Sequence, residues 1–218
     1  MNILCFDTSS SNLSVALGKD AATVVSRNFS LGHRLSDNLH AKLESVLQLK
    51  KLAWKDVDAF IVGTGPGSFT SLRVGVASVQ GLAFALGKPA VGVCSLEALA
   101  LAAGDHPSIW VINDARRHLL YAGHYAVKDG RLKILDKPAL LTFEELSARF
   151  REKSLFVGSG VALYRKELNR LKWAEKLLTD KEPQAKYLLP LGCALLKKKR
   201  KSPVLPLYLY PEDCQVRR

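Results

Sequence analysis

The glycine-rich run Gly63–Gly75, GTGPGSFTSLRVG, is the segment whose residue types and spacing most resemble a ligand-binding loop. It lies between a short apolar run and a long helical pattern, so its backbone N–H groups are expected at a helix N-terminus, where anions bind. It is neither a Walker A loop nor a GxGxxG fingerprint. The residues leave two alternatives open: a phosphate contact through Gly65, Gly67 and Ser68, or a tight turn that caps the helix.

Two carboxylates come at the ends of predicted buried strands. Asp7 follows the apolar run Asn2–Phe6, and Asp114 follows Ile109–Asn113. Either could approach a nucleotide-bound metal, or Asp7 could simply cap the turn. The candidate nucleotide or phosphate contacts are therefore Asp7, Thr8, Gly65, Gly67, Ser68 and Asp114.

The histidines and cysteines do not have the spacing of a metal site. His33 and His40 would lie about 10 Å apart along a helix axis, and His118 and His124 roughly 20 Å apart on a strand. The four cysteines form no CxxC pair, which is typical of a reduced compartment. We therefore expect a cytoplasmic protein. Because the chain has no GxSxG or HExxH motif, we also expect no metal ligand and no catalytic residue.

The formal charge of +12 first suggests nucleic-acid binding, but its distribution is uneven. Residues 1–130 carry 12 basic and 10 acidic side chains, whereas residues 131–218 carry 20 and 10. The basic run Lys197–Lys201 either interacts favourably with the dipole at the C-terminus of a helix or contacts RNA phosphates. The sequence thus predicts a peripheral RNA contact at most.

The hydrophobic periods predict an α/β protein. A strand meander over residues 2–29 precedes a helix at 35–49, a strand at 57–62, a helix at 70–86, a strand at 90–93 and a helix at 96–103. A second meander over 109–135 begins a related lobe, followed by helices near 143–150 and 164–171. We therefore expect domains at 1–104 and 105–183, and a C-terminal helix and tail at 184–218 that packs back on the first lobe. This order matches the ribonuclease H-like lobe of actin-like proteins.

The predicted helix Thr70–Leu86 has only one charged residue, Arg73, and apolar or small residues all round. Such a helix must be covered on every side, either by its own fold or by another protein. Small residues such as Gly75 and Ala77 permit a close approach of helices. The run Val74–Gly87 is shorter than the about 20 residues that a bilayer span requires.

Several motifs in this order resemble the TsaB (YeaZ) family. They are Asp7-Thr8-Ser9, a helix led by His33, GPGSFTSLRVG, Gln80-Gly81-Leu82-Ala83, Gly92-Val93-Cys94-Ser95-Leu96-Glu97, Asp114-Ala115-Arg116 and Pro206-Leu207-Tyr208-Leu209. The chain departs from the family at Ser71, where glycine is usual, and at Tyr210, where arginine is usual. Ser95 and Leu99 stand where the related catalytic protein TsaD has two metal-binding histidines, which implies that its catalytic site is absent here.

The resemblance implies a two-lobed actin-like ATPase fold with mixed sheets flanked by helices. It also implies a non-catalytic subunit for threonylcarbamoyl transfer to the tRNA adenosine beside the anticodon. The partners would be TsaD and the ATPase TsaE, with tRNA reached through the complex, a homodimer when alone, and no membrane. ATP or ADP with magnesium would belong to the assembled complex and not to the isolated chain.

The partner interface is expected on the first-lobe helices. Its residues would be His33, Leu39, Leu43, Arg73, Val76, Ala77, Gln80 and Leu82. Two other functions stay open: an autonomous ATPase or kinase of the actin-like class, and a glycopeptidase-like metalloprotease.

Overall fold

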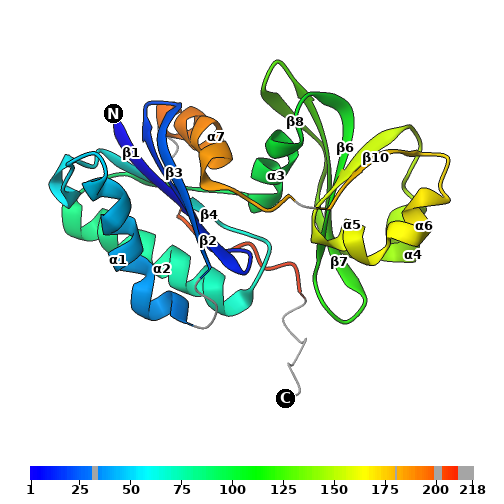
Figure 1. Ribbon diagram of the computed structural model, residues 1–218, viewed down its shortest axis with the longest axis horizontal. Coiled ribbons are helices and arrows are strands. Elements are labelled where there is room, and N and C mark those ends of the chain that lie inside the picture. Colours follow the sequence, from blue (N-terminus) through cyan, green and yellow to red (C-terminus); the bar gives the residue numbers. More distant parts are fainter. Residues whose placement is uncertain (31–33, 180, 199–202, 211–218) are drawn as a thin grey trace. The chain divides into compact units, whose positions relative to one another are not determined.

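The computed structural model describes residues 1–30, 34–179, 181–198 and 203–210. The chain divides into two compact units. Unit 1 comprises Met1–Ala102 and Glu182–Leu207, and unit 2 comprises Ala103–Lys181 and the chain from Tyr208 onward. Each unit is built on its own five-stranded sheet (Figure 1).

The sheet of unit 1 has the strand order β3-β2-β1-β4-β5. Its strands are β1 (Asn2–Asp7), β2 (Asn12–Lys19), β3 (Ala22–Ser30), β4 (Ala59–Gly63) and β5 (Ala90–Val93). β1 pairs antiparallel with β2 and parallel with β4, and β5 extends the parallel part. The carboxyl ends of β1, β4 and β5 therefore share one edge of the sheet, which brings Asp7, Gly63 and Val93 together.

Helices cover both faces of this sheet (Figure 1). α1 (Leu35–Gln48) and α2 (Phe69–Leu86) cover one face, to which β1 contributes Leu4 and Phe6. α7 (Ala185–Lys197) covers the other face, to which β1 contributes Ile3 and Cys5, and α3 (Ser95–Ala103) adds Ala98 there. A short 3-10 turn, Trp54–Asp56, precedes β4. Successive side chains of β1 point to opposite faces of the sheet, and helices bury them on both faces.

The sheet of unit 2 has the order β10-β9-β6-β7-β8. Its strands are β6 (His106–Asp114), β7 (Leu119–Lys128), β8 (Arg131–Thr142), β9 (Ser154–Val157) and β10 (Ala174–Leu178). β6, β7 and β8 form an antiparallel meander, while β9 runs parallel to β6. Three short helices pack against this sheet: α4 (Phe143–Ser147), α5 (Ser159–Leu163) and α6 (Arg165–Asn169).

The predicted α/β class with mixed sheets is confirmed, but three details of unit 2 differ from prediction. β8 continues to Thr142, well beyond the expected end at Leu135. Within the helix expected over 164–171, only α6 (Arg165–Asn169) is helical, and a further short helix, α5, precedes it at Ser159–Leu163. Strands β9 and β10 were not predicted, because one is only four residues long and the other carries Glu175 and Lys176 among its five residues.

Candidate functional site

The carboxylate of Asp7 is buried at the carboxyl ends of the parallel strands of unit 1, and both of its oxygens accept hydrogen bonds. Its Oδ1 accepts from the backbone N–H of Ser9 at 2.7 Å and from the Ser9 hydroxyl at 2.6 Å. Its Oδ2 accepts from the hydroxyl of Ser95 at 2.7 Å. Burial raises the pKa of Asp7, although the hydrogen bonds from Ser9 and Ser95 lower it.

The glycine-rich loop closes over this carboxylate. A Cβ atom at position 63 would collide with the carboxylate of Asp7, so only glycine fits there. Gly65 has a φ of 88°, a backbone conformation that favours glycine. The Gly65 N–H donates to the Ser95 hydroxyl at 3.0 Å, and the Gly65 carbonyl accepts from the Ser95 N–H at 2.8 Å. We call Asp7, Ser9, Gly65 and Ser95 the Asp7 cluster.

The remaining predicted contacts in unit 1 also have internal partners. The Ser68 N–H donates to the Ser9 carbonyl at 3.0 Å, and Gly67 lies against the same carbonyl. The Thr8 hydroxyl donates to the backbone carbonyl of Ser71 at 2.9 Å. The Ser68 side chain makes no capping bond to α2 and instead accepts from the Ser71 hydroxyl.

These contacts test whether a metal-bound nucleotide fits the predicted residues. Both oxygens of Asp7 already accept hydrogen bonds, and the N–H groups of Gly65 and Ser68 already donate within the chain. A phosphate would have to displace these bonds. The residues as arranged therefore do not fit a nucleotide held by Asp7 and the glycine-rich loop; they fit a rigid strand-to-helix connection.

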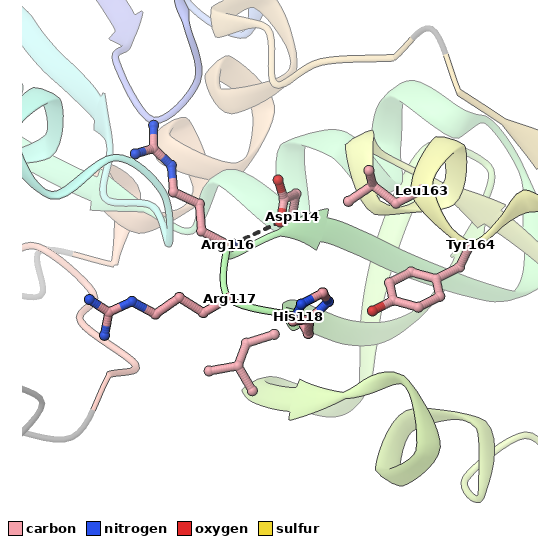
Figure 2. A pocket seen from close by; sticks show the side chains of 7 residues that line it. Asp114, Arg116, Arg117, His118, Leu163 and Tyr164 are labelled. Atoms are coloured by element: carbon pink, nitrogen blue, oxygen red, sulfur yellow. Dashed lines mark hydrogen bonds between the residues drawn. The ribbon is translucent and has the colours of Figure 1, made fainter.

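In unit 2, Asp114 lies at a surface pocket of about 400 Å³ beside the turn between β6 and β7 (Figure 2). Its residues are Asp114, Arg116, Arg117, His118, Leu119, Leu163 and Tyr164. Asp114 Oδ1 accepts from the Arg116 N–H at 2.7 Å, which shapes the turn. Burial and then the nearby carboxylates of Glu144, Glu167 and Asp114 raise the pKa of Tyr164, so its phenol stays protonated.

Within the described ranges, no three His, Cys, Asp or Glu side chains lie close enough together to hold a metal ion. His118 sits in the turn before β7, so it does not share a strand with His124 as predicted. His106 contacts Glu175 at 3.4 Å and the Ser108 carbonyl at 2.7 Å. Ser95 and Leu99, which the family resemblance aligns with the metal-binding histidines of TsaD, are buried in unit 1.

A hydrogen-bonded Ser-His-Asp arrangement in unit 2 was not predicted, because its members are far apart in sequence. The Ser108 hydroxyl lies 2.8 Å from His124 Nε2, and His124 Nδ1 lies 3.5 Å from Asp136. Ser108 is fully buried and also contacts the Ser154 hydroxyl at 2.7 Å. An inaccessible hydroxyl cannot attack a substrate, so we interpret this cluster as a structural network that joins β6, β7, β8 and β9.

This network predicts a pH-dependent stability. Burial lowers the pKa of His124, against the raising effect of Asp136 and Glu152. Below about pH 6.5 the unfolded chain therefore takes up a proton that the folded chain resists, and stability falls as the pH falls. His124→Gln should remove part of this loss between pH 7.5 and 5.5 in urea denaturation. His40→Gln, on the exposed side of α1, is the control; an identical pH dependence in wild type and both variants would contradict the prediction.

The predicted interface residues of α1 and α2 divide into two groups. Leu39, Leu43 and Val76 are buried in the core of unit 1, so their side chains are not available to another protein. The helical period correctly grouped them as apolar but could not distinguish core from interface. Arg73, Ala77 and Gln80 are exposed and Leu82 is half-buried, whereas His33 lies outside the described residues.

The outward surface of α2 is apolar, and most of it was not predicted. Only 22% of the residues of α2 are buried. Phe84 is 91% exposed and Phe69 51% exposed. They lie on one side of the helix with exposed small residues between them; we call this set the α2 face: Phe69, Arg73, Ala77, Gly81, Phe84 and Ala85. The guanidinium of Arg73 covers the ring of Phe69 at 3.8 Å.

By length and composition alone, α2 is the one helix of the described chain that could cross a membrane. The predicted basic run Lys197–Lys201 is described only for its first two residues; the others lie outside the described residues. The helix α7, which precedes this run, packs on β1, β2, β4 and β5 of unit 1.

Comparison with known proteins defines the class first. Residues 30–203 match the family model of TsaD, described as tRNA N6-adenosine threonylcarbamoyltransferase. The fold is also that of a putative N-acetylmannosamine kinase from Listeria monocytogenes, with a TM-score of 0.50, 11% identity, and coverage of 92% of this chain and 100% of the other. The chain is thus a two-unit protein of the actin-like fold.

Within this class, the chain belongs to the TsaB (YeaZ) family. It is 32% identical over 170 residues to the tRNA threonylcarbamoyladenosine biosynthesis protein TsaB of Bacillus subtilis, covering 76% of this chain and 74% of that protein. YeaZ from Pseudomonas aeruginosa has a TM-score of 0.81 at 28% identity and covers 95% of this chain and 99% of its own. The resemblance seen in the sequence motifs is confirmed.

Proposed function

We propose that the chain is a non-catalytic partner subunit required for transfer of the threonylcarbamoyl group to the tRNA adenosine beside the anticodon. It forms a heterodimer with the catalytic homologue TsaD and works together with the ATPase TsaE. Membership of the TsaB family supports the pathway. The observation that carries the role of partner subunit is the exposed apolar α2 face.

The α2 face suits helix-against-helix association with a homologous protein. A large exposed apolar surface on a soluble protein commonly marks an interaction site. Ala77, Gly81 and Ala85 leave room for a second helix to approach, while Phe69 and Phe84 provide large apolar side chains. Aromatic side chains in such a position commonly contribute most of the binding energy. The same face accounts for a homodimer when the partner is absent.

The Asp7 cluster supports the absence of catalysis by this chain. Asp7 and Ser95 occupy positions where an actin-like enzyme or TsaD would hold metal or nucleotide, yet here they bond to each other and to the loop. The subunit would then act by favouring one conformation of its partner, which requires different affinities for two partner states.

Complex formation tests the proposal. Purified full-length chain is mixed with TsaD of the same source and analysed by size-exclusion chromatography with light scattering. We expect a complex whose mass equals one copy of each chain, formed at the expense of the homodimer. Separate elution of the two proteins at micromolar concentration, with and without TsaE and ATP, would contradict the proposal.

The alternative function is an autonomous ATPase or kinase of the actin-like class, which only the shared fold supports. Because both oxygens of Asp7 are hydrogen-bonded within the Asp7 cluster and the N–H groups of Gly65 and Ser68 donate within the chain, we expect isothermal titration calorimetry with ATP and magnesium to detect no binding tighter than millimolar. Micromolar binding accompanied by steady ATP turnover would favour the enzyme instead.

A further inference from the structure

The turn between β6 and β7 is held by hydrogen bonds at both ends. The Ala115 N–H donates to the Leu119 carbonyl at 2.9 Å, and the Leu119 N–H donates to the Arg116 carbonyl at 3.0 Å. The Tyr210 hydroxyl donates to the Ala115 carbonyl at 2.5 Å. Tyr210, where the family commonly has arginine, therefore fixes the base of the turn, and its ring packs edge-on against Tyr121.

The backbone of this turn is strained. Arg116, Arg117 and His118 have φ values of 65°, 53° and 60°, all in the left-handed region. A residue other than glycine adopts this conformation at a cost in free energy, which glycine or asparagine would largely relieve. Strain of this kind is commonly found at functional sites. This strained turn displays the side chains of Arg116 and Arg117.

Those side chains are exposed cations. Figure 2 shows the guanidinium groups of Arg116 and Arg117 extending from the turn away from Tyr164. As far as the chain is described, neither guanidinium forms a hydrogen bond or an ion pair, and the neighbouring Asp114 accepts from the backbone N–H of Arg116 and not from its side chain. Two adjacent arginines without an intramolecular acceptor are available for an external anion.

We propose that Arg116 and Arg117 bind backbone phosphates of tRNA. The inference rests on the proposed function, which brings tRNA to the assembly. Guanidinium groups bind phosphate oxygens through two parallel hydrogen bonds, and two neighbouring arginines can contact successive phosphates. A free nucleotide fits less well, because both guanidiniums extend away from the pocket residue Tyr164 and the pocket itself contains the Asp114 carboxylate. The contact is sequence-independent and positions the RNA.

The test measures binding of a fluorescein-labelled tRNA transcript to the reconstituted assembly at 50–200 mM salt. Arg116→Ala/Arg117→Ala should weaken binding at least roughly tenfold, because charged hydrogen bonds to two phosphates are lost. The slope of log affinity against log salt should become shallower by about 0.7–0.9 per lost phosphate contact. Arg116→Lys/Arg117→Lys should restore most of the slope, since the charges remain.

The matched control removes two other exposed cations of unit 2, Arg149→Ala/Lys153→Ala. Lys153 precedes the amino end of β9, which runs parallel to β6, whereas Arg116 follows the carboxyl end of β6, so Lys153 lies toward the opposite strand ends of the sheet. The inference is overturned if the arginine variant binds tRNA like wild type, or if the control pair loses as much affinity. Failure of the arginine variant to co-elute with TsaD would also overturn it and place these residues in the protein interface. Co-elution of wild type tests the proposed function separately.

Discussion

Phe84→Glu leaves a folded, soluble chain that no longer co-elutes with TsaD. The side chain is 91% exposed in the chain alone, so the substitution removes almost no packing within unit 1. In the heterodimer the new carboxylate would be buried in an apolar contact without a partner, which is strongly unfavourable. Central aromatic side chains commonly contribute 2 kcal/mol or more, so affinity should fall by at least about 30-fold.

The matched control for this variant is Leu163→Glu. Leu163 is 59% exposed on unit 2 and lies outside the α2 face, so it undergoes the same kind of change on a different surface. We expect it to co-elute with TsaD like wild type. Phe84→Glu should also convert the isolated homodimer to a monomer. If both variants bind TsaD equally, another surface forms the heterodimer and the α2 face has been assigned wrongly.

Ser95→Ala should strongly destabilise unit 1. The Ser95 hydroxyl donates to Asp7 and accepts from the Gly65 N–H, and all three groups are buried. Its removal leaves a buried carboxylate with one partner fewer and a buried N–H without an acceptor. At about 1–3 kcal/mol for each unsatisfied group, the loss in free energy of unfolding should be about 3 kcal/mol.

Urea denaturation followed by circular dichroism measures this loss. The control is Ser10→Ala, whose hydroxyl is only partly buried and donates to the Asn12 carbonyl in the turn between β1 and β2. We expect a change below about 1 kcal/mol for that variant. An equally small change for Ser95→Ala would show that the Asp7 cluster is not the structural element that we describe. Asp7 would then again be a candidate ligand of a nucleotide-bound metal.

The fold was largely predictable because its strongest signals are local. The apolar run at β1, the alternation in β2 and the helical periods of α1 and α2 each identify an element within a few residues. β10 was missed because its edge position leaves Glu175 and Lys176 exposed, which removes the apolar pattern. β9 is too short for a periodic signal.

The candidate sites were less predictable, because they depend on contacts between distant residues. Asp7 and Ser95 are 88 positions apart, and only the parallel pairing of β1, β4 and β5 brings them together. Val76 is buried and Ala77 is exposed on α2, although both are apolar and adjacent in the sequence. The left-handed backbone of Arg116–His118 has no residue-type signal, since arginine and histidine do not favour that conformation.

The most direct test of the partner-subunit role is reconstituted threonylcarbamoyl transfer at a fixed concentration of TsaD. Assays contain tRNA, threonylcarbamoyl-adenylate, TsaE and ATP, and this chain is titrated from zero to excess. We expect product formation to depend on the chain, to saturate near one copy per TsaD, and to need much higher concentrations of Phe84→Glu. Full product formation without the chain, or by the chain without TsaD, would contradict the account.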